Sequence, residues 1–400
     1  MTSVNVSIEE VNGDKIVVIR VPRAIRQDKP VHINNDLYNG TYRRNGEGDY
    51  HCSQSEVKNM IRDAGDITQD KLVIEKFPLG ALNGETISRY RIRFSNLKRG
   101  HVFDKLPDEV FLQKIGAAKR SEQDGEIHPT LAGLLMFGND TEITDEFPQY
   151  FLDYREPLSK TGERWSDRVT SGTGDWSGNL YDFYFRIQDR LTADVKVPFK
   201  LINGQDRIDY TPMHEAIREA LANAIIHADY YERRGLVIEK RKDEIIIANP
   251  GALRIPKQEA IEGGISDPRN SSIFLMFSLV GIGERAGSGL ASIAAVWKEN
   301  KLPTPNLTEQ FNPDRTILTL SLCAENVGVN VGVNVGVKLT KSEKSILDLL
   351  AKDGELTALA LSTMIEKDLR TVERGLKSLK TNGLIERVGA DKNGSWRIIK

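Results

Sequence analysis

The clearest helical pattern of hydrophobic and polar positions lies at residues 211–230, TPMHEAIREALANAIIHADY. Thr211 can cap the N-terminus of a helix, and Pro212 suits the first helical position, where a missing N–H costs nothing. Apolar side chains occupy most sides of this predicted helix. One face is polar and repeats every four residues, at Glu219, Asn223 and His227. Such a stripe is unusual for a face that meets only solvent. It suits a carboxylate that polarises water and an amide that ligates Mg²⁺ beside phosphates.

Residues 1–65 begin with VNVSIEEVNGDKIVVIRVP, which alternates apolar and polar positions on both sides of Asn12-Gly13 and predicts a β-hairpin. A second strand pair and a short helix near residues 53–64 follow. A hairpin with so few strands is marginal by itself. We therefore expect this part to be a piece of a larger β-rich domain.

The second strand pair carries a Tyr-x-Arg-x-Gly signature at Tyr42, Arg44 and Gly46. With it, residues 1–65 resemble the C-terminal part of the Alba-like, Schlafen-type domain. The first half of that domain, with its acidic and glycine-rich strands, is absent from the sequence. We expect either a fragment or a chain that starts within the domain. Arg43 and Arg44 either contact nucleic acid or form a solvated hairpin tip.

Residues 66–200 predict a connector of helices and strands. It begins with an amphipathic helix at residues 106–120, an apolar core helix at 129–137 and a strand at 147–156. A loop or lid rich in Ser, Gly and Asp follows at 164–179, and then a helix with a buried aromatic face at 180–195. The aromatic residues of the last helix follow helical spacing, so they indicate a core and not a base-stacking platform.

Residues 201–322 carry the candidate chemistry. Two strands follow the polar-striped helix and lead directly into Asn249-Pro250-Gly251. A loop rich in Gly, Ser and Pro and an apolar helix come next. Gly287-Ser288-Gly289 then opens another helix, and residues 315–322 alternate as a closing strand.

The end of the chain divides into a repeat and a compact tail. Residues 323–339 contain NVGV three times, which indicates a linker. The second interpretation is a strand that adds to another sheet or mediates a homodimer. Residues 340–400 predict three helices and a hairpin turning at Asn393-Gly394, the pattern of a winged helix-turn-helix.

The tail is basic although the whole chain is not. From Lys338 it has 13 Lys and Arg against 9 Asp and Glu, a net charge of +4, whereas the full chain has −2. The third helix directs four residues outward, Arg370, Thr371, Arg374 and Lys377, and these are the predicted contacts with double-stranded DNA. The alternative is a winged helix that mediates dimerisation or docks on a protein.

Composition narrows the class of protein. The chain has 400 residues, 39% of them hydrophobic and 28% charged, which is ordinary for a folded multidomain protein. Two cysteines far apart argue against a disulfide scaffold and a cysteine-rich zinc site. No run of 18 apolar residues and no signal peptide occurs. We therefore expect a cytoplasmic protein with no membrane partner.

Several familiar chemistries are excluded by their motifs. His214-Glu215 begins like HExxH, but Arg218 stands where the second His is required. No P-loop and no G-x-S-x-G elbow occur, and the glycines from Gly281 onward miss the dinucleotide-binding spacing.

After these exclusions, three motifs remain in a fixed order along the chain. They are the helix with Glu219 and Asn223, the strand that ends in Asn249-Pro250-Gly251, and Gly287-Ser288-Gly289, which opens a helix. This order resembles the Bergerat (GHKL) ATP-binding fold. The segments EALANAIIHADY, IIIANPGAL, DPRNSSIF and GERAGSGL more closely resemble predicted transcriptional regulators with a RecG C-terminal-like ATPase domain. That family couples a Schlafen-type domain, this ATPase domain and a winged helix. The implied fold class is α+β multidomain, with a partial Alba-like segment, a GHKL-type α/β sandwich and a C-terminal winged helix.

The resemblance assigns roles by position. Glu219 would be the general base and Asn223 the Mg²⁺ ligand, Gly251 would line the adenine side, and Gly287 and Gly289 would hold the phosphates of ATP. Glycines let the backbone approach closely, and a helix N-terminus favours phosphate.

The sequence departs from the family at Asn249, where members that hydrolyse nucleotide have Asp. An Asn can accept from the adenine amino group but lacks the charge. Arg269 either meets a γ-phosphate or pairs with Asp267, and His227 is expected to be a structural residue.

The predicted function is a prokaryotic-type transcriptional regulator in which an ATP-binding domain modulates a DNA-binding tail. The alternatives are a Mg²⁺-dependent ATPase in nucleic-acid processing or defence, and a scaffold with a degenerate nucleotide pocket.

Overall fold

The computed structural model describes residues 6–11, 13–21, 23–45, 48–157, 165–193, 195, 201–202, 206–207, 211–283, 289–311, 313–323, 340–352, 356–365, 367–381, 385–388 and 395–398. The chain forms two compact units, Met1–Ala324 and Glu325–Lys400. Across the described residues the structure has thirteen α-helices, none of them long and apolar enough to cross a membrane.

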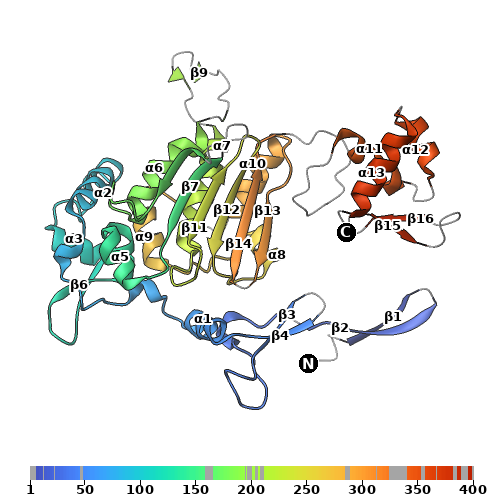
Figure 1. Ribbon diagram of the computed structural model, residues 1–400. Helices are drawn as coiled ribbons and strands as arrows, with labels where there is room; N and C mark the ends of the chain where they lie inside the picture. Colours follow the sequence, from blue (N-terminus) through green and yellow to red (C-terminus); the bar gives the residue numbers. More distant parts are fainter. Residues whose placement is uncertain are drawn as a thin grey trace. The chain divides into compact units, whose positions relative to one another are not determined.

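A six-stranded mixed sheet forms the centre of the first unit (Figure 1). Its strand order is β13-β14-β12-β11-β7-β8, and within it only β11 and β7 run parallel. The strands are β7 (Leu152–Pro157), β8 (Trp165–Thr170), β11 (Leu236–Lys240), β12 (Glu244–Pro250), β13 (Asn306–Gln310) and β14 (Arg315–Ser321).

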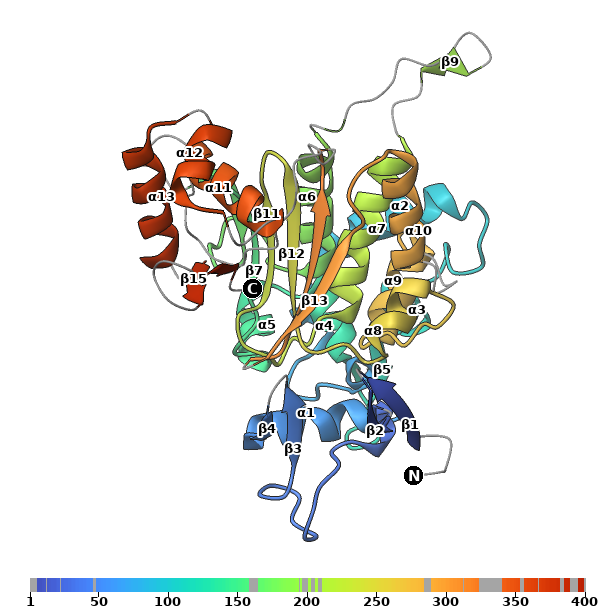
Figure 2. The ribbon, with the colours of Figure 1, turned by 90° about the vertical axis from the view of Figure 1, so that its right-hand side faces the viewer.

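Helices α6, α7, α9 and α10 lie on one face of this sheet (Figure 2). They span Leu180–Thr192, Pro212–His227, Ser271–Leu279 and Gly289–Glu299. Their apolar sides and the inward residues of the strands form one hydrophobic core, in which Trp297 is fully buried and its indole N–H donates to the Ser321 carbonyl oxygen at 2.7 Å. Burial of this kind of surface is the main stabilising contribution to the fold.

A mainly helical layer continues this core. It contains α2 (Gly84–Leu97), α3 (Asp108–Ile115), α4 (Leu131–Phe137), α5 (Asp140–Glu146), the short strands β5 (Ala118–Arg120) and β6 (Ile127–Pro129), and the 3₁₀ turns Gln69–Lys71 and Leu79–Ala81. Tyr90 lies at its centre, with ring contacts to Phe111, Phe137 and Tyr181 and a hydrogen bond from its hydroxyl to the Met276 carbonyl oxygen.

Two sequence-based boundaries in this region are wrong. The helix expected at 106–120 ends at Ile115, because Gly116 adopts a left-handed φ of 85° that stops it. Within the expected loop or lid at 164–179, residues 165–170 instead form the strand β8, which pairs with β7. Its Ser- and Asp-containing sequence, WSDRVT, hid the alternation of an edge strand.

The N-terminal region contains two hairpins, a 3₁₀ turn and one helix. They are β1 (Val6–Val11) with β2 (Asp14–Ile19), β3 (Tyr42–Asn45) with β4 (Gly48–His51), Arg26–Asp28, and α1 (Gln54–Ala64). Ser53 and Glu56 form a capping box that starts α1. Arg43 is not part of a solvated hairpin tip, because its guanidinium binds both oxygens of Asp314 at 2.6 and 2.9 Å. Gly46 lies outside the described residues.

The second unit has three helices and a hairpin around its own small core. These are α11 (Lys341–Lys352), α12 (Ala358–Met364), α13 (Leu369–Thr381), β15 (Ile385–Val388) and β16 (Ser395–Ile398). The NVGV repeat lies outside the described residues. In the first unit, most of the segment around the short strands β9 (Leu201–Ile202) and β10 (Asp206–Arg207) also lies outside the described residues. The first unit also contains the helix α8 (Lys257–Glu262).

Candidate functional site

The polar stripe of α7 lines a cavity of about 180 Å³. The helix begins after Thr211, whose backbone N–H and side chain both meet His214 Nδ1, with Pro212 in the first turn. Ten of its residues are buried, which fixes the orientation of the remaining face. Glu219, Asn223 and His227 are each half-buried and all face the cavity.

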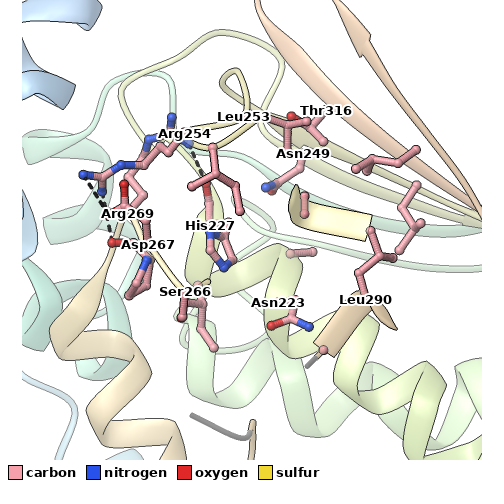
Figure 3. A pocket seen from close by; sticks show the side chains of 18 of the residues that line it. Asn223, His227, Asn249, Leu253, Arg254, Ser266, Asp267, Arg269, Leu290 and Thr316 are labelled. Atoms are coloured by element: carbon pink, nitrogen blue, oxygen red, sulfur yellow. Dashed lines mark hydrogen bonds and ion pairs between the residues drawn. The ribbon is translucent and has the colours of Figure 1, made fainter. Parts of the chain in front are cut away.

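The cavity lies between α7, the start of α10, the sheet and the segment that follows β12. Figure 3 shows Asn249 and Thr316 together at the strands, with Asn223 and Leu290 across from them and His227 between. Most of the lining is apolar, from residues such as Ile247, Leu253, Ile293, Leu307 and Leu318. A largely apolar cavity with a few placed polar groups is the usual form of a small-molecule site.

Glu219 and Asn223 form one polar cluster with Gly289. Asn223 Nδ2 donates to Glu219 Oε1 at 3.1 Å. A Cβ added to Gly289 would lie 2.5 Å from Asn223 Nδ2, which is too close, and 3.1 Å from Glu219 Oε1, which is tight. A larger residue at position 289 would therefore displace the Asn223 amide from its place beside Glu219. Gly287 lies outside the described residues.

Asn249 lies on β12 at the opposite part of the cavity. It is only 8% exposed, and its Oδ1 is buried without a hydrogen-bond partner among the described residues. Leaving a buried oxygen unpaired costs about 1–3 kcal/mol. Thr316 faces Asn249 in the β12–β14 register, and its hydroxyl donates to the Gly251 carbonyl oxygen at 3.0 Å.

Gly251 does not itself line the cavity but shapes the turn beside it. Its φ is 98°, a region that strains other residues. An added Cβ would lie 2.8 Å from Arg269 and 2.9 Å from Asp229. Its role in the structure is thus to hold Thr316 and to make room for Arg269.

Arg269 is buried, and its guanidinium donates hydrogen bonds to acceptors of the protein. Its Nε and Nη2 donate to the two oxygens of Asp63 at 3.1 and 2.8 Å. Its remaining hydrogen bonds go to the carbonyl oxygens of His227 and Ala252. Of the two alternatives for Arg269, the surface pair with Asp267 is wrong: Asp267 binds Arg26 at 2.6 Å, and Arg269 pairs with a carboxylate 206 residues away in sequence.

His227 is held in its neutral form. Burial, together with the neighbouring positive charges of Arg269 and Arg254, lowers the pKa of its imidazole to about 4. The side chain lines the cavity, while its backbone oxygen accepts from Arg269. At neutral pH it adds a polar but uncharged group to the site.

Several cavity residues were not singled out by the sequence pattern. They lie on β14, after β12 and at the start of α10, and they include Thr316, Leu253, Arg254, Asp267 and Leu290. The alternation of RTILTLSL indicated a strand, but nothing local indicated that Thr316 would face Asn249. That pairing depends on the register of β12 with β14.

In the second unit, Arg370, Arg374 and Lys377 of α13 are exposed, whereas Val372, Leu376 and Leu379 are buried. Thr371 is half-buried, and its hydroxyl donates to Asp368 at 2.6 Å in the first turn of the helix. The three basic side chains thus lie on the outward face of α13.

Comparison with known families bears on two regions. Residues 234–319 match the family described as "Putative ATP-dependent DNA helicase recG C-terminal". The chain therefore carries a RecG-like, ATPase-type domain. Residues 58–153 match a domain of unknown function. The RecG-like match contains Asn249, Gly251, Arg269 and Gly289 but begins after α7.

No curated protein matches the chain. Among solved structures, the crystal structure of the DIP2311 protein from Corynebacterium diphtheriae is similar over 98% of this chain and 75% of that chain, with 17% identity and a TM-score of 0.49. At this level of similarity nothing about function follows.

Proposed function

We propose that the first unit binds an adenine nucleotide with Mg²⁺ in the α7 cavity and that the nucleotide modulates DNA binding by the second unit. The observation that carries the proposal is the cluster of Glu219, Asn223 and Gly289 at one part of a largely apolar cavity that has an unpaired buried oxygen, Asn249 Oδ1, at another. The match to an ATPase-type family over residues 234–319 supports it.

The base would lie between the apolar residues beside Asn249. The Asn249 oxygen would accept a hydrogen bond from the amino group of adenine, which removes the cost of leaving that oxygen unpaired. An amide accepts more weakly than the carboxylate of Asp, so this site is expected to bind nucleotide less tightly than one with Asp at this position.

The phosphates would lie at the start of α10. Helix N-termini favour anions, and Gly289 lets the backbone approach. The Asn223–Glu219 hydrogen bond uses the amide nitrogen, so the amide oxygen is the atom that would meet Mg²⁺. Among the described residues no cluster of three acidic, His or Cys groups is placed to hold a metal ion. Mg²⁺ would therefore bind through Asn223 together with phosphate oxygens, as it commonly does.

ATP hydrolysis is the second candidate function. Glu219 lies one helical turn from Asn223 and within the same cavity, which is the position from which a carboxylate can take a proton from water. Hydrolysis requires this role, whereas simple binding does not.

The DNA-binding part of the proposal rests on α13 and its hairpin. Three exposed basic residues on the outward face of a third helix, in a unit with net positive charge, are typical of a winged helix that contacts phosphates. Nucleotide would act by shifting the population of conformations that bind DNA.

Calorimetric titration of the full chain with Mg·ATP, Mg·ADP and Mg²⁺ alone tests the nucleotide site. Binding would give a heat of binding, and the midpoint of thermal unfolding would rise with nucleotide concentration because the nucleotide binds the folded chain. A midpoint that is the same in all three conditions, with no heat of binding, would exclude a nucleotide function and leave a scaffold with a degenerate pocket. Titration with duplex DNA over a range of salt concentrations tests the second unit: no binding even at low salt would exclude that part.

A further inference from the structure

Residues 26–65, which we call the N-terminal segment, contact one side of the cavity although they lie outside the region that matches the RecG-like family. One side of the cavity is formed by residues 252–269, which we call the wall segment. Arg26 and the end of α1 contact it through charged side chains. Asp63 belongs to the region matched as a domain of unknown function, and Arg269 to the RecG-like region. These contacts therefore join two separately recognised parts of the chain.

Arg269 connects three elements at once. Its paired hydrogen bonds to Asp63 hold it to α1, its bond to the His227 oxygen holds it to the end of α7, and its bond to the Ala252 oxygen at 3.0 Å holds it to the turn after β12. Two of these three elements line the cavity. The position of α1 is thus transmitted to the cavity through one planar guanidinium, whose bidentate geometry tolerates little displacement.

Arg26 makes a second connection to the same wall. Its Nε donates to Asp267 Oδ2 at 2.6 Å, and its Nη1 donates to the carbonyl oxygens of Asp63 and Gly65 at 2.8 and 2.9 Å. A cation at the C-terminal carbonyls of a helix is favourable, so Arg26 caps α1 while it holds Asp267. The other oxygen of Asp267 lies 3.4 Å from Arg254, which also lines the cavity.

Asp63 supplies the carboxylate that binds the buried guanidinium of Arg269. Burial by itself would raise the pKa of the Asp63 carboxyl, but the hydrogen bonds from Arg269 and the positive charges of Arg269, Arg254 and Arg62 together hold the pKa below its usual range. Arg254 is only 5% exposed at its side chain, and its Nε has no hydrogen-bond partner among the described residues. Without Asp63, Arg269 would lose the carboxylate that binds it directly, and the carboxylates that remain near it are Asp229 and Asp267. Two like charges in a poorly solvated wall repel each other strongly.

A second pair supports α1 at the end of α7. Arg62 pairs with the buried Asp229, and its guanidinium lies 4.8 Å from the centre of the Tyr231 ring. Asp229 lies two residues after the end of α7, and its backbone N–H donates to the Pro250 carbonyl oxygen at the end of β12. The contacts of α1 therefore converge on the junction of α7 and β12, the two elements that carry Asn223 and Asn249.

We propose that Asp63 and Arg26 are positioning residues for the α7 cavity, so that docking of α1 and binding of nucleotide are coupled. This inference rests on the proposed nucleotide site and adds its regulation by the N-terminal segment. Because coupling is reciprocal, nucleotide stabilises the docked α1, and anything that pulls α1 away weakens nucleotide binding. The effect acts through the wall segment, since neither Asp63 nor Arg26 lines the cavity itself.

The test compares Asp63→Asn with Asp66→Asn in the full chain. Both changes remove one carboxylate from the same stretch, but Asp66 is exposed and three residues further along. Hydrogen exchange is measured first without nucleotide. Residues 252–269 should exchange about 10-fold faster in Asp63→Asn than in the wild type or in Asp66→Asn, because the wall loses its anchor. Equal exchange in the two variants would overturn the proposal.

The same measurement with Mg·ATP separates coupling from nucleotide binding. In the wild type, nucleotide should slow exchange at both 252–269 and 54–64, and Asp63→Asn should lose the effect at 54–64 and bind Mg·ATP about 10-fold more weakly. Protection of the wall without protection of α1 would overturn the coupling. No protection at either segment in the wild type would refute the nucleotide site, and the exchange without nucleotide would still decide whether Asp63 positions the wall.

Arg26→Gln provides a second variant in case Asp63→Asn folds poorly. Arg44→Gln is its control, because Arg44 pairs with Asp49 on the exposed surface of the β3–β4 hairpin. Faster exchange of the wall in Arg26→Gln and not in Arg44→Gln is the expected result, and the same exchange in both would overturn the role of Arg26.

Discussion

Asn223 donates its side-chain amide to the Glu219 carboxylate at 3.1 Å, and the first residue of α10, Gly289, lies directly against the pair. The hydrogen bond joins two residues one turn apart on α7 and fixes the direction of both side chains. Since α10 begins at this point, the pair and the helix N-terminus share one small volume. A substitution at Gly289 should therefore displace the Asn223–Glu219 pair although both of these residues stay unchanged.

Gly289→Ala should weaken nucleotide binding at least about 10-fold, because the new methyl group would overlap Asn223 Nδ2. The free energy of unfolding should fall by about 1–3 kcal/mol, as for other overpacked positions. Gly80→Ala is the control, since an added Cβ there meets no atom within 4 Å. Calorimetry of both variants checks the prediction, and nucleotide affinity unchanged in Gly289→Ala would contradict the placement of the phosphates.

Asn249→Leu should separate stability from binding. Leucine has the same branched arrangement of four side-chain heavy atoms and removes the unpaired buried oxygen, so the free energy of unfolding without ligand should rise by about 1 kcal/mol. Binding of ATP should weaken because the adenine amino group loses its acceptor. Inosine triphosphate lacks that amino group and serves as the control ligand. The wild type should prefer ATP to inosine triphosphate, and the variant should bind the two alike. A preference for ATP that survives in the variant would show that Asn249 does not contact the base.

The polar face of α7 could be predicted because its signal is local. Glu219, Asn223 and His227 recur at the helical period within nine residues, and the structure places all three along one cavity. Gly289 was identified in the same way, from a glycine pattern before a helix. The lining by Thr316 could not be predicted, because it depends on the register between β12 and β14, which a single sequence does not specify.

The charged contacts between the N-terminal segment and the wall segment could not be predicted from the sequence either. Asp63 and Arg269 are 206 residues apart, and each belongs to a stretch that looks like ordinary solvent-exposed sequence. Charged residues are usually exposed unless they are paired, so the burial of Arg269 against the half-buried Asp63 is decided by the packing of α1 and not by the pattern around either residue. The strand β8 was missed for a related reason, since its alternation is visible only once β7 is beside it.

The pH dependence of stability should reveal the neutral His227. Its pKa is about 4 in the folded chain and near 6.5 when the chain is unfolded, so between these values the unfolded state binds more protons. The free energy of unfolding should therefore fall as pH decreases from 6.5 towards 4, with a contribution from this residue of about 1–2 kcal/mol at pH 5. In His227→Gln the fall should be smaller by that amount. Urea unfolding of both proteins at pH 7.5 and pH 5 measures it, and equal falls would contradict the burial of the imidazole.

Glu219→Gln should distinguish hydrolysis from binding. The amide keeps the size and the hydrogen bond to Asn223 but cannot accept a proton from water, so turnover should fall about 10²-fold or more while binding of Mg·ATP persists. Asn223→Ala should instead lose the Mg²⁺-dependent part of the binding. Phosphate release and calorimetry on the same preparations provide the two measurements. A wild type that binds ATP and releases no phosphate would exclude the ATPase candidate and leave the regulator.

Arg374→Ala with Lys377→Ala should weaken binding of duplex DNA and flatten its salt dependence. Both side chains are exposed on α13, and each lost phosphate contact should lower the slope of log affinity against log salt by about 0.9. Lys344→Ala removes an exposed charge from α11 and is the control for a general loss of positive charge. Because these contacts are to phosphate, the loss should be similar for different DNA sequences. If the double variant keeps the wild-type affinity and slope, α13 does not face the DNA, and the second unit serves instead for dimerisation or for docking on a protein.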